Sequence, residues 1–270
     1  MVAKLKRKIN DSQTVANIRP EKEKRMKKWQ KAALIILIVC LCLWVLIGAV
    51  VLIAKALTYD TDWDAIRELE NEGGYHLQDI GDDTLVFVPD DPKVGFIFYP
   101  GGFVEYSAYI PLMRALAAEG ILCILPRMPL NLAVLDVNAA EGMKEHFPQI
   151  KSWYIGGHSL GGSMAASYLE KNQDQFVGLI LLASYSTADL SESYSPALSI
   201  YGSCDGVLNM KKYDENKKNL PFDNFTEYVI DGGNHAGFAS YGVQKGDGEA
   251  TISFKEQIDI TVEQIRSFIG

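Results

Sequence analysis

Beyond residue 63, apolar and polar residues follow two alternating patterns along the chain. Short apolar runs rich in Val, Ile and Leu are typical of buried strands, and apolar residues spaced three and four apart are typical of helices. Strands are predicted at 84–88, 94–99, 121–125, 153–155, 177–182, 197–201 and 226–230, with a weaker one at 76–79. Helices are predicted at 63–70, 109–119, 134–147, 163–171, 210–216 and 254–268. This alternation predicts an α/β fold with a mainly parallel eight-stranded sheet and helices on both faces.

A different pattern precedes these elements. Residues 32–54 form a stretch of 23 residues without a charged side chain. As a helix it would span roughly 35 Å, enough to cross a hydrocarbon core of about 30 Å. A cleaved signal peptide is the alternative, because residues 54–56 are similar to a small-x-small cleavage site. Signal peptides have shorter apolar regions of about 7–15 residues, so a retained transmembrane helix is favoured.

The charges are distributed unevenly around this stretch. Residues 1–31 hold eleven Lys and Arg against three acidic residues, a net charge of +8 in a chain of net charge −8. A basic flank predicts that the N-terminus stays in the cytoplasm and that the remainder lies outside the cell membrane. The basic residues lack the aromatic interleaving of nucleic-acid binders, so no nucleic-acid partner is expected.

The expected organisation therefore has four parts. It comprises a basic cytoplasmic tail at 1–31, a single transmembrane helix at 32–54, a tether at 55–63 and a globular domain at 64–270. A domain of about 210 residues is of ordinary size for one hydrophobic core.

The sequence Gly157-His158-Ser159-Leu160-Gly161 has the form G-x-S-x-G and lies between a predicted strand and a predicted helix. A serine on such a sharp turn adopts a strained backbone conformation, and small residues two positions away on either side prevent clashes. This setting predicts that Ser159 is a nucleophile. A glycine-rich turn with an idle serine is the alternative.

Four histidines are available to activate the serine: His76, His146, His158 and His235. In the α/β hydrolases, which this motif resembles, the acid and then the histidine follow the serine along the chain, and this order excludes His76 and His146. His158 directly precedes the serine, and its side chain is expected to leave the turn in another direction. His235, in a loop after the predicted strand at 226–230, is therefore the predicted base. A surface loop histidine is the alternative.

Two aspartates are candidates for the acid. Asp205 follows the predicted strand at 197–201, where it can accept a hydrogen bond from the histidine ring. Asp231 lies four residues before His235, and an aspartate before two glycines commonly orders a turn. Asp205 is preferred because of its place at a strand end.

Acyl transfer also requires donors for a developing oxyanion. The predicted strand at 94–99 opens into Pro100-Gly101-Gly102-Phe103, where glycine permits close approach of a substrate. The N–H of Gly102 is the first choice, with that of Phe103 next. The N–H of Leu160, the residue after the nucleophile, is the expected second donor. A hairpin turn with two glycines is the alternative for the first segment.

Together these segments resemble the small bacterial α/β hydrolases of the fold-5 type, which are related to the dienelactone hydrolases. The resemblance covers roughly residues 64–270 and rests on 99–105, 157–162, 202–205, 233–238, 241–242 and 246–248. It implies an α/β-hydrolase fold with Ser159 as nucleophile, Asp205 as acid and His235 as base. Dienelactone hydrolases carry a cysteine nucleophile, so their substrate is not transferred to this chain.

The expected activity follows from these parts. Residues 183–196 are too few for a large helical lid, so the pocket is expected to be open and suited to small or extended substrates. We expect a membrane-anchored serine hydrolase that cleaves carboxylic ester or thioester bonds through an acyl-enzyme, without cofactor or metal. Its substrate would be a small-molecule or lipid-derived ester. The alternatives are an acyltransferase with the same triad and a non-catalytic binding module on this fold. Trp63, Glu105 and Asp247 receive no role.

Overall fold

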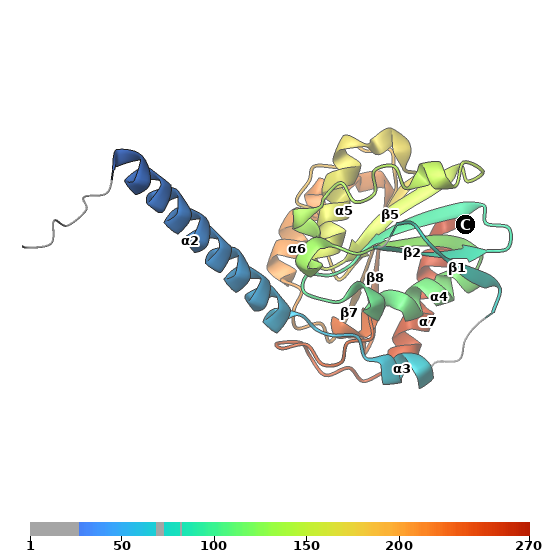
Figure 1. The fold of residues 1–270 in the computed structure, drawn as a ribbon. Coiled ribbons are helices and arrows are strands. Elements are labelled where there is room, and N and C mark those ends of the chain that lie inside the picture. The colour runs from blue at the N-terminus through green and yellow to red at the C-terminus, as the bar shows by residue number, and fades with distance from the viewer. Residues whose placement is uncertain (1–26, 69–72, 82) are drawn as a thin grey trace, which may run out of the picture. The chain divides into compact units, whose positions relative to one another are not determined.

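The computed structural model describes residues 27–68, 73–81 and 83–270 of the chain. The described residues fall into two units, which are divided between Val50 and Val51. From Lys28 on, the first unit is helical and belongs to α2 (Lys28–Leu57), a single long helix in Figure 1. This helix is long and apolar enough to cross a membrane. It begins four residues before the predicted span and ends three residues after it. Most of the predicted basic tail, residues 1–26, lies outside the described residues.

The second unit is built on one sheet of eight strands in the order β1-β2-β4-β3-β5-β6-β7-β8. The strands are β1 (Tyr75–Asp79), β2 (Thr84–Pro89), β3 (Val94–Tyr99), β4 (Ile121–Pro126), β5 (Ser152–His158), β6 (Gly178–Leu182), β7 (Ala197–Gly202) and β8 (Phe225–Ile230). Strand β1 pairs with β2, and β2 with β4, in antiparallel orientation. The other six strands, β4, β3, β5, β6, β7 and β8, run parallel to one another. The predicted sheet and all eight predicted strands are confirmed.

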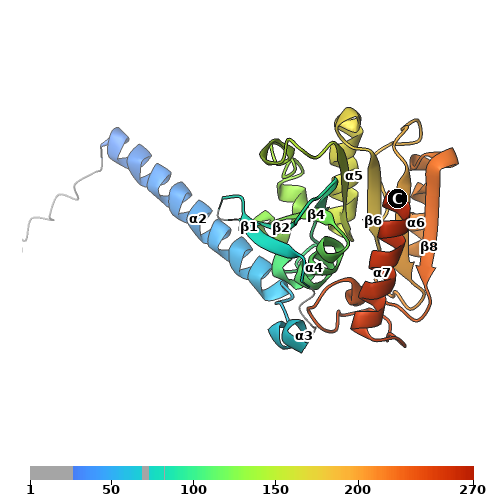
Figure 2. The same ribbon diagram turned by 90° about the vertical axis from the view of Figure 1, so that its right-hand side faces the viewer.

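Helices cover both faces of this sheet, as Figures 1 and 2 show. They are α4 (Ile110–Ala118) and α7 (Phe254–Ile269) on one face, and α5 (Leu160–Lys171) and α6 (Met210–Asn216) on the other. Successive strand side chains point to opposite faces. Phe96 and Phe98 of β3 accordingly pack into the core beneath α4 and α7, whereas Ile97 and Tyr99 pack beneath α5. A short helix, α3 (Trp63–Glu68), begins where predicted, and residues 69–70 of that prediction lie outside the described part.

The predicted helix at 134–147 is wrong. The structure has turns there, with short 3₁₀ segments at Ala133–Leu135 and Lys144–His146. Gly142 adopts φ +75°, which interrupts any regular helix. The buried hydroxyl of Tyr99 donates to the carbonyl of Val137 at 2.9 Å and accepts from the N–H of Ala140 at 2.8 Å. This tertiary bridge supplies hydrogen bonds that a helix would otherwise provide.

Residues 55–63, which were predicted to be a tether, are instead partly helical and partly bonded to the domain. Helix α2 continues to Leu57, and the residues that follow are bonded to the domain. Tyr59 forms an isolated parallel bridge with Val104, and the N–H of Asp62 donates to the carbonyl of Ser240 at 2.8 Å. This segment is therefore fixed in place by backbone hydrogen bonds.

The carboxyl ends of parallel strands meet at the same edge of a sheet. Here the segments after β5, β7 and β8 carry Ser159, Asp205 and His235, respectively. Residues 183–196, after β6, form turns and extended segments, as expected of a fold without a large lid. The topology thus brings the three predicted residues to one edge.

Candidate active site

Ser159 lies on the turn between β5 and α5 with φ +52° and ψ −122°. A positive φ is strained for a residue with a side chain. The turn tolerates only glycine at its closest approaches. A Cβ atom on Gly157 or Gly161 would collide with the carbonyl oxygen of Tyr99. The Ser159 backbone is held by its N–H, which donates to the carbonyl of Leu182 at 2.9 Å.

The side chains of His235 and Asp205 are hydrogen-bonded, with 2.9 Å between Nδ1 and Oδ2. Both are almost fully buried, with 2% and 1% of their side-chain surfaces exposed. The second carboxylate oxygen of Asp205 accepts from the N–H groups of Val207 and Leu208, both at 2.8 Å. These two bonds fix the carboxylate, so it can orient the imidazole.

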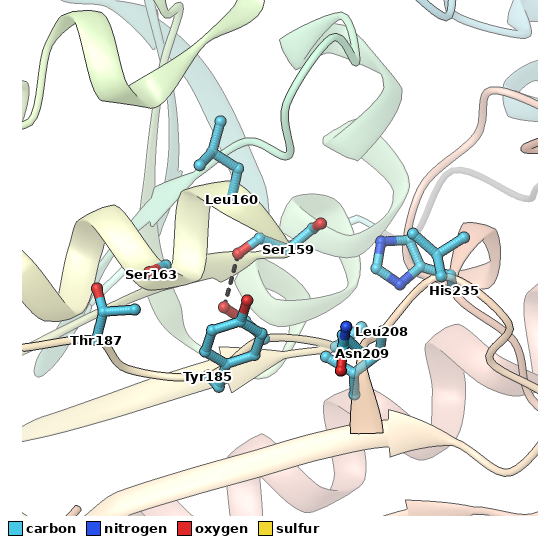
Figure 3. A pocket seen from close by; sticks show the side chains of 11 residues that line it. Ser159, Leu160, Ser163, Tyr185, Thr187, Leu208, Asn209 and His235 are labelled. Carbon is cyan, nitrogen blue, oxygen red and sulfur yellow. Dashed lines mark hydrogen bonds between the residues drawn. The ribbon is translucent and has the colours of Figure 1, made fainter. Parts of the chain in front are cut away.

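The opposite ring nitrogen of His235, Nε2, has no hydrogen-bond partner among the described residues although it is buried. Figure 3 shows the hydroxyl of Ser159 pointing toward this ring. A buried nitrogen without a partner is costly unless the site uses it. The arrangement suits a proton transfer between Ser159 and His235.

Asp231, the rival acid, lies elsewhere. It is exposed and accepts a hydrogen bond from the hydroxyl of Ser203 at 3.2 Å. The N–H of Gly232 in turn donates to that hydroxyl at 2.8 Å. Asp231 therefore orders the turn after β8, as the sequence pattern indicated for it.

Asp247, to which the sequence analysis gave no role, has a structural one. Its carboxylate accepts from the N–H groups of Gly206, His235, Ala236 and Gly248 at 3.1, 3.2, 2.8 and 2.9 Å. One carboxylate thus joins the segment after Asp205 to the segment that carries His235. The available signal was its place between two glycines in residues 246–248, but that pattern does not reveal which loops the carboxylate joins.

His158 lies beside His235, with 4.5 Å between the ring centroids. Burial, followed by the nearby charge of His235, lowers the pKa of His158 well below its usual range. The hydroxyl of Tyr109 accepts from the N–H of Gly101 at 2.9 Å and lies 2.8 Å from Nδ1 of His158. Burial raises the pKa of Tyr109, so its hydroxyl keeps a proton to donate to that nitrogen. His158 is therefore neutral and places no positive charge beside His235.

The predicted oxyanion donors differ in their availability. The N–H of Phe103 donates to the carbonyl of Asn131 at 2.7 Å and is already used. The N–H groups of Gly102 and Leu160 donate to no described residue. A Cβ atom added to Gly102 would lie 3.0 Å from Cδ2 of Leu160, so the two residues are adjacent. Leu160 is also the first residue of α5, where N–H groups have no acceptor within the helix.

A cavity of about 280 Å³ opens beside Ser159 and His235. Its lining combines apolar side chains, including Val207 and Leu208, with uncharged polar ones, including Tyr185 and Thr187. Figure 3 shows Tyr185, Thr187 and Leu208 on the side of the serine that faces this cavity. Within the described part of the chain, no cluster of three or more His, Cys, Asp or Glu residues is arranged to hold a metal ion.

Comparison with solved structures supports the same architecture. A predicted CIB-like hydrolase from Thermoplasma acidophilum is 18% identical, with a TM-score of 0.52 over 72% of this chain and 100% of its own. TT1662 from Thermus thermophilus is 14% identical, with a TM-score of 0.54 over 72% and 98%. Est1E from Butyrivibrio proteoclasticus is 13% identical, with a TM-score of 0.51 over 73% and 98%. At these identities the similarity shows the fold alone.

Sequence comparison identifies the family. No curated protein matches the chain. The model of the alpha/beta hydrolase family matches residues 95–259, a region that begins in β3 and ends in α7 and includes all three predicted triad residues. This match spans more than half of the chain, which therefore belongs to the alpha/beta hydrolase family.

Proposed function

We propose that this protein is a serine hydrolase that cleaves carboxylic ester or thioester bonds through an acyl-enzyme. The observation that carries the proposal is the buried 2.9 Å hydrogen bond between His235 and Asp205, combined with the unpartnered Nε2 of His235 beside Ser159. Such a constellation is recognised by geometry and not by position in the chain. The proposal includes the lidless, dienelactone-hydrolase-related type that the sequence motifs indicate.

In the proposed reaction, Nε2 of His235 removes the hydroxyl proton as Oγ of Ser159 attacks the acyl carbonyl carbon. The carbonyl oxygen becomes an oxyanion that accepts hydrogen bonds from Gly102 and Leu160. His235 then gives its proton to the departing alcohol or thiol, which leaves an acyl-serine. Water attacks this ester in the second half, and His235 again transfers the proton. Asp205 stabilises the transient imidazolium.

The lining of the pocket supports a small, neutral substrate. Among the described residues, no Asp, Glu, Lys or Arg side chain lines this cavity. An anionic acyl group would therefore lose solvation without gaining a charged partner. The hydroxyls of Tyr185 and Thr187 form no hydrogen bond with a described residue and are available to a polar substrate group. A volume of about 280 Å³ suits a compact ester.

We further propose that α2 anchors the enzyme in the cell membrane. Its length and apolar composition support a membrane span, and the basic residues that precede it support a cytoplasmic N-terminus. The hydrolase domain would then lie on the outer side. A cleaved signal sequence is the competing proposal, because an apolar helix near the N-terminus is also found in signal sequences.

Replacing the nucleophile tests the proposed function. Ser159→Ala is expected to abolish hydrolysis of p-nitrophenyl acetate, since loss of a triad serine costs up to about 10⁶-fold in turnover. Ser167→Ala, which removes a part-buried serine hydroxyl from α5, the helix that follows Ser159, should retain parental activity. Ester hydrolysis by the purified Ser159→Ala variant within tenfold of the parent would contradict the assignment.

The two aspartates should differ in turnover. Asp205→Asn is expected to lower kcat by about 10³- to 10⁴-fold, because an amide favours the wrong imidazole tautomer. Asp231→Asn changes an exposed turn residue and should alter kcat less than threefold, roughly the effect of a weak surface hydrogen bond. Steady-state kinetics of both variants decide the question, and the reverse ranking would make Asp231 the acid.

Asp247 should contribute mainly through the loops that it joins. Asp247→Ala leaves four N–H groups without their acceptor, and the expected loss is about 1–3 kcal/mol in the free energy of unfolding. Asp223→Ala, at an exposed position, should change it by less than about 0.5 kcal/mol. Denaturant unfolding in detergent measures both. Equal effects would show that the Asp247 hydrogen bonds add no stability.

The membrane proposal predicts a defined topology. The full-length chain should remain in the membrane fraction after an alkaline wash. Protease added to intact spheroplasts should digest the hydrolase domain and spare an N-terminal tag. Protection of the domain, under conditions that cut an outer-face control protein, would reverse the orientation. A soluble form that starts near Leu57 would instead support signal cleavage.

A further inference from the structure

The segment Thr58–Asp62, which we call the strap, lies against the loop that carries Gly102. The N–H of Tyr59 donates to the carbonyl of Phe103 at 2.7 Å, and the N–H of Glu105 donates to the carbonyl of Tyr59 at 3.1 Å. Tyr59 thereby adds a short parallel bridge to the loop at Val104. The strap precedes residues 95–259, so it lies outside the region that matches the family.

Side chains strengthen this attachment. The carboxylate of Glu105 accepts from the N–H of Thr61 at 2.9 Å, and the hydroxyls of Thr61 and Ser107 are 2.6 Å apart. The amide of Asn131 donates to the hydroxyl of Thr58 at 3.2 Å. The strap is thus bonded along its length to Phe103, to residues that follow Phe103, and to Asn131. Glu105, to which the sequence analysis gave no role, serves here as an acceptor.

Two peptide planes connect the strap to the oxyanion site. In a trans peptide the C=O and N–H point in opposite directions, so fixing one fixes the other. Tyr59 holds the carbonyl of Phe103, and the N–H of the same peptide, on Val104, donates to the carbonyl of Gly101 at 3.3 Å. That carbonyl shares its peptide with the N–H of Gly102. The strap therefore sets the direction in which the Gly102 N–H points.

The loop requires such support. Phe103 adopts φ +57°, a left-handed conformation that is strained for a residue with a side chain. Strained conformations persist only where the surrounding structure holds them. Phe103 is held at its N–H by the carbonyl of Asn131 and at its own carbonyl by Tyr59. Without the second bond, one end of the strained residue is free to relax.

We propose that the strap is a positioning element of the oxyanion site, and that Tyr59 aligns the Gly102 N–H with the transition state. The inference rests on the proposed function, because it assumes that Ser159 generates an oxyanion beside Gly102. The residues that follow the apolar helix are accordingly part of the catalytic architecture. They act through Gly102 and do not touch the substrate.

The test removes the backbone donor of Tyr59 in the full-length chain. Tyr59→Ala is the side-chain control, because it loses the ring contact with Tyr241 and the hydroxyl that accepts from the N–H of Lys245 but keeps the backbone donor. Tyr59→Pro lacks the N–H that holds the Phe103 carbonyl. Asp60→Pro is the matched control, since its N–H donates to no described residue and proline favours an extended residue before it. Loss of an oxyanion donor costs about 10²- to 10³-fold, so misalignment of one should lower kcat roughly 10- to 100-fold. The KM should change less than threefold, roughly, because the pocket walls are untouched.

A second pair of variants covers the case in which Tyr59→Pro fails to fold. Glu105→Ala removes the acceptor of the Thr61 N–H, whereas Glu105→Gln retains an amide oxygen in its place. Glu105→Ala should lower kcat, and Glu105→Gln should restore it. The inhibition constant of an alkyl boronic acid, whose serine adduct places an oxygen in the oxyanion site, should rise in proportion to the loss of kcat/KM.

The outcomes separate the two proposals. A parent that neither hydrolyses esters nor binds the boronic acid would overturn the proposed function and this inference with it. An active parent combined with a folded Tyr59→Pro variant as active as Asp60→Pro would overturn the inference alone. So would an increase in KM at unchanged kcat. A selective loss of kcat with weaker boronic acid binding is the result that the strap predicts.

Discussion

The left-handed backbone of Ser159 is the constraint on which the rest of the site depends. At φ +52°, the backbone of Ser159 directs the hydroxyl away from the sheet. This conformation requires β5 to turn into α5 within one residue. That turn brings the backbone of α5 so close to β3 that Gly161 has no room for a Cβ atom beside the carbonyl of Tyr99. The same geometry leaves the N–H of Leu160 without an internal acceptor. The position of the proposed nucleophile and the free N–H of the proposed oxyanion donor thus have one structural origin.

Around this turn, the other parts of the site are held by hydrogen bonds between segments that are distant in sequence. Asp247 joins the loops of Asp205 and His235, and the strap holds the loop of Gly102. His158 contributes a different constraint, because burial keeps it neutral next to His235. When His235 takes up a proton in the proposed reaction, it therefore meets no second imidazolium on His158. The site is therefore preorganised by backbone contacts and by the control of charge.

Much of this architecture could be predicted from local sequence. The apolar runs of strands β2 to β8 and the weaker pattern of β1 were sufficient to predict all eight strands, because a buried strand has a short apolar sequence that can be recognised locally. The proposed triad residues were selected from the glycine-rich setting of Ser159, from the strand-end position of Asp205 and, for His235, by elimination of the other histidines. The structure brings Asp205 and His235 within 2.9 Å, whereas their catalytic roles stay predictions.

What sequence reasoning missed depends on contacts between distant residues. The apolar spacing at 134–147 resembles a helix, but the hydroxyl of Tyr99 satisfies Val137 and Ala140 in a turn. The role of Asp247 is visible only when the loops after β7 and β8 are seen to meet. The strap was expected to be a tether, because nothing local in residues 58–62 reveals the hydrogen bond from Tyr59 to Phe103.

The central claim is that Ser159 is the nucleophile of a working hydrolase. Reaction of the full-length protein with a fluorophosphonate, followed by mass spectrometry of its peptides, tests this claim most directly, because the reagent requires an activated serine. The account predicts one phosphonyl adduct, on Ser159, whose formation is slowed strongly by Asp205→Asn. The absence of an adduct, or an adduct on another serine such as Ser163, would contradict it.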